Sequence, residues 1–114
     1  MTDTHEGSHV CRHFQAAADL LGQRWVPQIL GALLDGVTRY SELKTAVQGI
    51  SHASLSDRLK ELESRSIVVR VVTPSTPVRV DYRLTPAGED LARVIGELGA
   101  WAERWAKEPA ASPA

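Results

Sequence analysis

Residues 51–60 contain side chains that can hydrogen-bond to nucleic-acid bases and to phosphates. Leucines at 55, 59 and 62 have the i, i+4, i+7 spacing of one buried helical stripe, so the polar residues among them face outward to varying degrees. Small residues near the start of such a helix let its backbone approach the major groove of DNA, and its free N–H groups can bind a phosphate. The candidate DNA-contacting residues here are Ser51, His52, Ala53, Ser54, Ser56, Arg58 and Lys60.

A helix–turn–helix is the element that must position this segment. Ser41 begins a brief predicted helix with Leu43 on its inward side. Gly49 suits the left-handed conformation that ends a helix, and Ser51 can cap the next one. The polar residues of 51–60 then lie on the second helix of the pair. On its own, this pattern fits an ordinary surface helix as well as a recognition helix.

A β-hairpin is predicted directly after that helix. Residues 67–73 are rich in β-branched side chains, and residues 74–77 have strong turn chemistry. Residues 78–84 alternate between apolar and polar side chains, which predicts a strand with one buried face and with Arg79, Asp81 and Arg83 on the other. Arg79, just past the hairpin tip, is typical of a wing that reaches a DNA backbone or minor groove. Taken alone, it fits a solvated surface charge equally well.

The remaining elements are helices on either side of this unit. Apolar residues at helical spacing predict a first helix that Gly22 ends and a second over residues 25–36 that an Asp-Gly pair closes. Residues 37–39 are expected to be extended. Thr-Pro at 85–86 is a cap with proline at the first helical position, and it begins a last helix that can reach about Trp105. The predicted order is α-α-β-α-α-β-β-α, an α+β fold that is mainly α.

Length and composition predict one folded domain. The chain has 114 residues, of which 43% are hydrophobic and 24% charged, and this excludes disordered and collagen-like classes. We expect the domain over residues 10–107, between flexible tails at 1–9 and 108–114. No hydrophobic run is long enough to span a bilayer, and the lone Cys11 permits no internal disulfide. These features favour a cytoplasmic protein without a membrane partner.

The charge is distributed unevenly along the chain. Between Thr38 and Arg83, eight Lys or Arg residues stand against five Asp or Glu, so this stretch carries +3 although the whole chain carries −1. A polyanion responds to the local field rather than to the molecular total. The basic middle is therefore compatible with DNA binding, although as a signal it is modest.

Four motifs are specific enough to compare with a known family. They are G-x-R-W at 22–25, R-Y-S-E-L at 39–43, G-I-S-x-x-x-L-S-x-R-L-K-E-L-E at 49–63 and V-x-Y-x-L-T-x-x-G at 80–88. Together they resemble the HxlR-type branch of the MarR-like winged-helix transcription regulators, over nearly all of residues 11–105. The resemblance implies a homodimeric regulator that binds a near-palindromic double-stranded DNA operator. We expect it to repress transcription, without a cofactor.

The last predicted helix also carries the spacing of a helix that packs along its length against another. Its apolar residues recur 3, 4, 3 and 4 positions apart, at Leu91, Val94, Leu98, Trp101 and Trp105. A domain this small has little core left to cover two tryptophans. We therefore expect these residues and Phe14 in a dimer interface, with packing onto the chain's own first helix as the alternative. A dimer would hold its recognition helices about 34–36 Å apart, one turn of B-DNA.

Cys11 lies just ahead of the first helix, where members of that family commonly have a cysteine that senses oxidants or electrophiles. It stands one residue further from Trp25 than the common pattern, and Arg12 follows it in place of the usual proline. A helix N-terminus and neighbouring cations would favour the reactive thiolate, whereas an inert buried thiol is the alternative. A metal site is disfavoured because the nearby ligands are loosely spaced, at His5, His9 and His13.

Other functions fit parts of the sequence. A winged-helix module could bind another protein through the same helix, and a small molecule could control a regulator in place of thiol chemistry. Trp25 and Tyr40 are interpreted as core aromatics that could border a small ligand pocket. An enzyme is disfavoured, because the S-x-x-K match at residues 41–44 lacks its companion motifs and no nucleophile is paired with a base.

Overall fold

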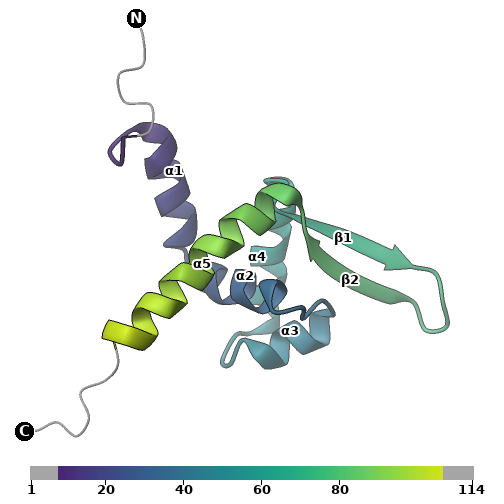
Figure 1. Ribbon diagram of the computed structural model, residues 1–114. Coiled ribbons are helices and arrows are strands. Elements are labelled where there is room, and N and C mark those ends of the chain that lie inside the picture. The colour runs from purple at the N-terminus through teal and green to yellow at the C-terminus, as the bar shows by residue number, and fades with distance from the viewer. Residues whose placement is uncertain (1–7, 107–114) are drawn as a thin grey trace, which may run out of the picture.

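Within residues 8–106, which the computed structural model describes, five helices and one two-stranded antiparallel sheet follow one another (Figure 1). The mainly helical α+β class predicted from the sequence is confirmed. The tails expected at 1–9 and 108–114 lie almost wholly outside the described residues and stay a prediction. The elements are α1 (Arg12–Leu21), α2 (Val26–Leu34), α3 (Tyr40–Ala46), α4 (His52–Ser64), β1 (Val68–Thr73), β2 (Arg79–Leu84) and α5 (Pro86–Trp105).

Two predicted side-chain caps begin helices, and a predicted left-handed glycine lies in the turn ahead of α4. At the start of α4, Ser51 Oγ accepts a hydrogen bond from Ser54 N at 3.0 Å. At the start of α5, Thr85 Oγ1 accepts one from Gly88 N, also at 3.0 Å. Gly49, ahead of α4, has a φ of +89°. Each cap satisfies an N–H group that has no partner within its helix, so both cap predictions are confirmed. Gly49 has the predicted left-handed conformation, but it lies beyond the end of α3, whose C-cap residue is Val47.

The start of α5 is fixed to the start of β1. Thr85 Oγ1 donates to the Ser66 carbonyl at 2.6 Å, and Thr85 N donates to the Ile67 carbonyl at 3.0 Å. A Cβ atom at Gly88 would lie 2.0 Å from the Ile67 carbonyl oxygen, which is closer than packed atoms approach. The threonine and glycine of the motif at 80–88 are therefore required by this helix–strand junction.

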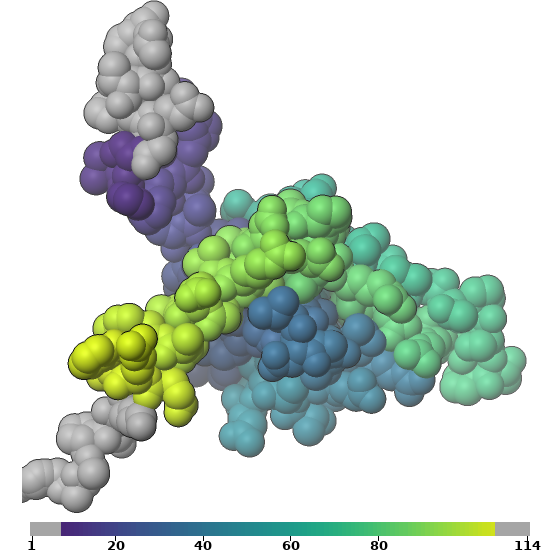
Figure 2. Space-filling view, viewed as in Figure 1, coloured from purple at the N-terminus to yellow at the C-terminus, as the bar shows by residue number. Residues whose placement is uncertain are grey.

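The core is built around α2, which packs against α5, while α4 packs against β1. Figure 2 shows α5 lying across the body of the molecule, with α1 and the hairpin extending from it in different directions. Each helix within residues 8–106 is too short or too polar to span a bilayer. The largest fully buried side chains come from α2, α3, α4 and β1: Val26, Ile29, Leu30, Leu43, Leu55, Leu59, Leu62 and Val68.

The extended segment predicted at residues 37–39 is present, but it is not a full strand. It joins β2 through an isolated bridge between Arg39 and Asp81 and through a 2.8 Å hydrogen bond from Tyr82 N to the Thr38 carbonyl. The sheet therefore keeps two strands, which pair from Val68↔Leu84 to Thr73↔Arg79. The short segment ties the hairpin to the turn between α2 and α3.

The burial predicted from the alternation in residues 78–84 was wrong at two positions. Val78 precedes β2 and is exposed, although its apolar type predicted a buried position. Asp81, predicted on the solvated face, is only 2% exposed. Its carboxylate can be buried because it accepts hydrogen bonds from two side chains, one of them 43 residues away in the sequence. Hydrophobic periodicity cannot detect a polar partner at that distance along the chain.

Candidate nucleic-acid interface

The rotation of α4 about its axis decides which of its polar residues face outward. Leu55, Leu59 and Leu62 are fully buried on one side. Since an α-helix turns by about 100° per residue, Ala53 and Lys60 lie on the side opposite those leucines. Both are exposed. The predicted outward face of α4 is thus present, although the acidic Asp57 shares it and lowers its positive charge.

One flank of this face is held by α3 through Tyr40. Tyr40 Oη donates to the His52 carbonyl at 3.1 Å and lies 3.0 Å from Ser56 Oγ and 3.3 Å from His52 Nδ1. The Tyr40 and His52 rings stack with centroids 5.9 Å apart and planes inclined by 7°. The ring of Tyr40 packs against the core, as predicted. The position of its hydroxyl at the first turn of α4 was not predicted.

The other flank is held by the turn between α1 and α2. Arg58 Nε donates to the Arg24 carbonyl at 3.0 Å, and Arg58 Nη1 lies 3.6 Å from Glu61 Oε1. Gln23 Nε2 donates to Glu61 Oε2 at 3.1 Å. Arg58 therefore lies on the opposite flank from His52, and part of its guanidinium is occupied within the chain. The remaining N–H donors of Arg58 and the imidazole of His52 would therefore contact different parts of a bound ligand.

The cation of the hairpin is held by the buried carboxylate of Asp81. Arg79 Nε lies 2.9 Å from Asp81 Oδ2, and Thr38 Oγ1 donates to Asp81 Oδ1 at 2.8 Å. The hydrogen bond from Arg79, followed by that from Thr38, holds the pKa of the Asp81 carboxyl below its ordinary value. The same hydrogen bond raises the pKa of Arg79. About half of the Arg79 side chain remains exposed, so the rest of its guanidinium can still meet an anion.

A hollow of about 600 Å³ lies between the hairpin tip and the start of α3. Two arginines and several hydroxyl groups line it, a combination that suits a phosphate. Arg39 was not predicted to belong to an anion site, because only the fold brings this residue next to the hairpin. The lining residues are Arg39, Tyr40, Ser41, Ser75, Thr76, Pro77, Val78, Arg79 and Val80.

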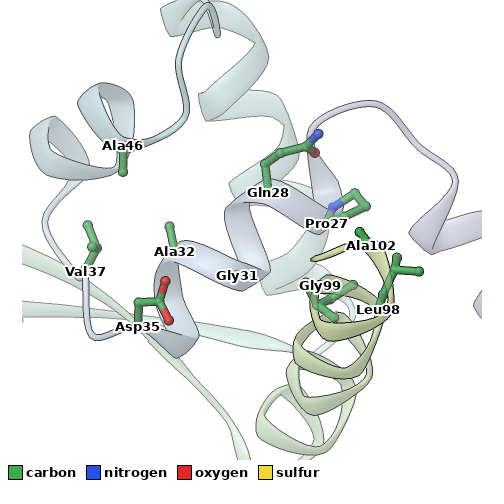
Figure 3. A pocket seen from close by; sticks show the side chains of 11 residues that line it. Pro27, Gln28, Gly31, Ala32, Asp35, Val37, Ala46, Leu98, Gly99 and Ala102 are labelled. Atoms are coloured by element: carbon green, nitrogen blue, oxygen red, sulfur yellow. The ribbon is translucent and has the colours of Figure 1, made fainter. Parts of the chain in front are cut away.

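The apolar residues of α5 that were assigned to a dimer interface are largely uncovered. Leu98 and Trp101 are each 55% exposed and Trp105 is 68% exposed, while Val94 and Phe14 are also exposed and Leu91 is half-buried. An apolar groove of about 470 Å³ runs between α1 and α5. A second hollow, of about 480 Å³, lies between α2 and the end of α5, with Leu98, Gly99 and Ala102 across from Pro27 and Gln28 (Figure 3). Large exposed apolar surfaces of this kind mark interaction sites.

Cys11 is the N-cap residue of α1, where its Sγ accepts a hydrogen bond from Phe14 N at 3.3 Å. The side chain is buried, with 8% exposure. Residues 8–106 contain no group of three or more His, Cys, Asp or Glu side chains placed to hold a metal ion. His5 lies outside the described residues. The thiol is thus positioned by the helix that also presents Phe14.

Comparison with known proteins agrees with the motifs. The model of the HxlR-like helix-turn-helix family matches residues 20–110. The HTH-type transcriptional regulator YvaP of Bacillus subtilis is 46% identical over 98 residues, which cover 86% of this chain and 91% of YvaP. The reduced form of the transcriptional regulator YodB from the same species superposes with a TM-score of 0.74 at 42% identity, covering 86% and 96% of the two chains. Its quinone-bound form gives 0.70 at 38% identity, covering 84% and 100%.

We predict that Asp81→Asn destabilises the fold at neutral pH and that this effect disappears in acid. Because the folded-state pKa of Asp81 is lowered, its carboxylate contributes stability above the ordinary carboxyl pKa that is lost as the pH falls through the lowered value. Urea unfolding of both proteins from neutral pH to about pH 2 measures the difference. Asp90→Asn is the matched control, since its pair with Arg93 is mostly exposed and contributes little. A destabilisation by Asp81→Asn that stays constant with pH would contradict the assignment.

Proposed function

The chain belongs to the HxlR-like helix-turn-helix family and is a transcriptional regulator of the helix-turn-helix type; from that premise we propose that it represses transcription as a homodimer bound to a near-palindromic operator. The observation that carries this proposal is the outward polar face of α4, which buried leucines fix from behind and two flanking elements hold in place. A dimer seated on an operator blocks access to the DNA beneath it, and repression follows from that obstruction. Such a regulator acts in the compartment of its DNA, which we expect to be the cytoplasm.

We assign the base contacts to the start of α4 and the phosphate contacts to its periphery. Ser51, Ser54 and the free N–H groups of the first turn meet the nearest phosphates, while His52, Ala53 and Ser56 face base edges in the major groove. Lys60 lies further along the exposed face and contacts the backbone. Arg58 contacts an adjacent phosphate through the donors that Arg24 and Glu61 leave unused.

The hairpin supplies the second part of the interface. Arg79 meets the DNA backbone in the orientation that Asp81 imposes on it. Arg39 lines the same hollow from the α3 side, so a phosphate seated there would contact two guanidinium groups. A rigid hairpin with a fixed cation makes contacts that depend on charge and position rather than on base sequence. The winged helix is therefore proposed to read sequence through α4 and to bind the backbone through the hairpin.

We propose that the exposed apolar residues of α5 and Phe14 form the dimer interface. Exposure of two tryptophans and a leucine to water is unfavourable, and about 25 cal/mol per Å² is recovered when such surface is buried. The groove between α1 and α5 continues this surface and offers a second apolar wall. Pairing also doubles the phosphate contacts, which offsets the small net charge of one chain.

Cys11 is proposed as the residue through which an oxidant or electrophile controls the regulator. YodB, solved in reduced and quinone-bound forms, is the relative that motivates this proposal. Attack of the Cys11 thiolate on a ring carbon of a quinone would form a C–S bond, and one quinone oxygen would take a proton from water. Transfer of the hydrogen on the attacked carbon to the second oxygen would then give the hydroquinone thioether. Cys11 Sγ caps α1 by accepting a hydrogen bond from Phe14 N. The adduct would remove this cap and shift Phe14 in the proposed interface.

Arg79→Ala is predicted to weaken binding to every DNA sequence and to flatten its salt dependence. The slope of log affinity against log salt should fall in magnitude by about two, one phosphate contact for each subunit. Titration of random and selected duplexes at two or more salt concentrations measures this slope. Arg93→Ala is the matched control, because it removes the same charge from α5. Binding of the unaltered protein that does not weaken as salt rises would instead favour a protein-binding winged helix.

Treatment with diamide or benzoquinone is predicted to reduce operator affinity at least tenfold, an effect of about 1.4 kcal/mol. Cys11→Ser should bind the same operator in untreated buffer and should not respond to either reagent, because the chain contains one cysteine. Operator fragments selected from genomic DNA serve as the probe, and mass spectrometry locates the adduct. Unchanged affinity of the treated protein, with Cys11 fully modified, would refute sensing through this thiol.

A further inference from the structure

The Tyr40 hydroxyl meets three groups of α4, and its hydrogen-bonding capacity matches them. Oη lies 3.1 Å from the His52 carbonyl oxygen, 3.0 Å from Ser56 Oγ and 3.3 Å from His52 Nδ1. A phenolic hydroxyl has one proton to donate and lone pairs that accept. The carbonyl oxygen can only accept, whereas the serine hydroxyl can donate and Nδ1 donates when it carries a proton.

One assignment of protons turns all three contacts into hydrogen bonds. The Tyr40 proton goes to the His52 carbonyl, and both Ser56 Oγ and His52 Nδ1 donate to the Tyr40 oxygen. Donation from Tyr40 to Nδ1 or to Ser56 would instead leave the carbonyl contact without a proton. The arrangement therefore requires a proton on Nδ1 of His52. In the neutral imidazole, Nε2 is then an acceptor.

The stacked rings keep His52 in the orientation that this assignment needs. The Tyr40 and His52 planes are inclined by 7° at a centroid separation of 5.9 Å. A half-turn of the imidazole would preserve the stack but would exchange Nδ1 for a carbon atom and lose the hydrogen bond to Tyr40. The hydroxyl, rather than the stack, therefore selects the tautomer.

From this geometry we propose that Tyr40 is a positioning residue that makes His52 and Ser56 hydrogen-bond acceptors toward DNA, so that α4 selects an adenine or cytosine amino group. The inference rests on the proposed function, in which both residues face base edges. His52 is exposed, and its Nε2 makes no hydrogen bond to the residues that the structure describes. In the major groove the donors are adenine N6 and cytosine N4, while guanine and thymine present acceptors there.

The tautomer is tested first on the free protein. At pH about 8.5, where an ordinary imidazole is neutral, long-range ¹H–¹⁵N correlation distinguishes a protonated Nδ1 from a protonated Nε2. His52→Ala identifies the signals among the four histidines. Unaltered protein should show Nδ1–H at His52, and Tyr40→Phe should show mainly Nε2–H, the form that free imidazoles favour in water. Tyr82→Phe, which changes the other tyrosine of the chain, should leave the signals unmoved.

Sequence preference is tested second, by selection from a random duplex library. Unaltered protein should favour adenine or cytosine at one position in each half-site, and Tyr40→Phe should reduce that preference about five- to tenfold, the effect of one hydrogen bond. The same substitution made in a background that carries both His52→Ala and Ser56→Ala should add no further loss at that position. The far-UV circular dichroism of Tyr40→Phe should match that of the unaltered protein, which separates positioning from a general loss of structure.

The tautomer measurement and the selection experiment can contradict different steps of the proposal. Nε2–H at His52 in the unaltered protein, or a tautomer that Tyr40→Phe does not change, would overturn the inference even if the protein binds its operator well. Protonated Nδ1 together with a preference for guanine or thymine at that position would overturn the base-reading step. Absence of any sequence preference in the unaltered protein would instead defeat the proposed function, and the base-reading step with it.

Discussion

The burial of three leucines beneath α4 is the constraint on which the rest of the interface depends. Leu55, Leu59 and Leu62 lie against the core with at most 1% exposure, and each contributes about 1.5–3 kcal/mol when it leaves water. Rotation of α4 by even one residue would expose part of this stripe. The buried leucines therefore determine which polar side chains of α4 face outward, although the leucines themselves would not contact a ligand.

Contacts on both flanks of α4 then restrict the positions of the polar side chains that the buried leucines leave on its outward face. Tyr40 holds the first turn of α4 from the α3 side, and Arg58 holds the middle of the helix to the turn between α1 and α2. The hairpin is restrained in a similar way, because the buried Asp81 binds both Arg79 and Thr38. Helix, hairpin and the turns beside them thus form one surface whose charged and polar groups have fixed relative positions, as preorganised recognition requires.

Periodic features of the sequence predicted the helices and strands. The positions of Asp81 and of the Tyr40 hydroxyl were not predicted, because they depend on polar contacts between residues far apart in the sequence. Leucine spacing, helix caps and the β-branched run each reflect a local pattern, so the helices and the hairpin were found close to their observed bounds. Asp81 was placed on the wrong face because its partner Thr38 is 43 residues away. The role of Tyr40 was missed for the same reason, since its hydroxyl contacts a different helix. Such contacts depend on how elements pack, which residue type and spacing do not specify.

The proposed repressor requires that two copies of the chain hold their α4 helices about one turn of B-DNA apart. Spin labels on Glu63→Cys, an exposed position near the end of α4 and away from the proposed base contacts, in a Cys11→Ser background, allow the distance between the two α4 helices to be measured by pulsed dipolar spectroscopy with and without operator DNA. We predict a distribution centred at about 35 Å that narrows when DNA binds. Absence of a dipolar signal, or a separation far from one helical turn, would contradict it.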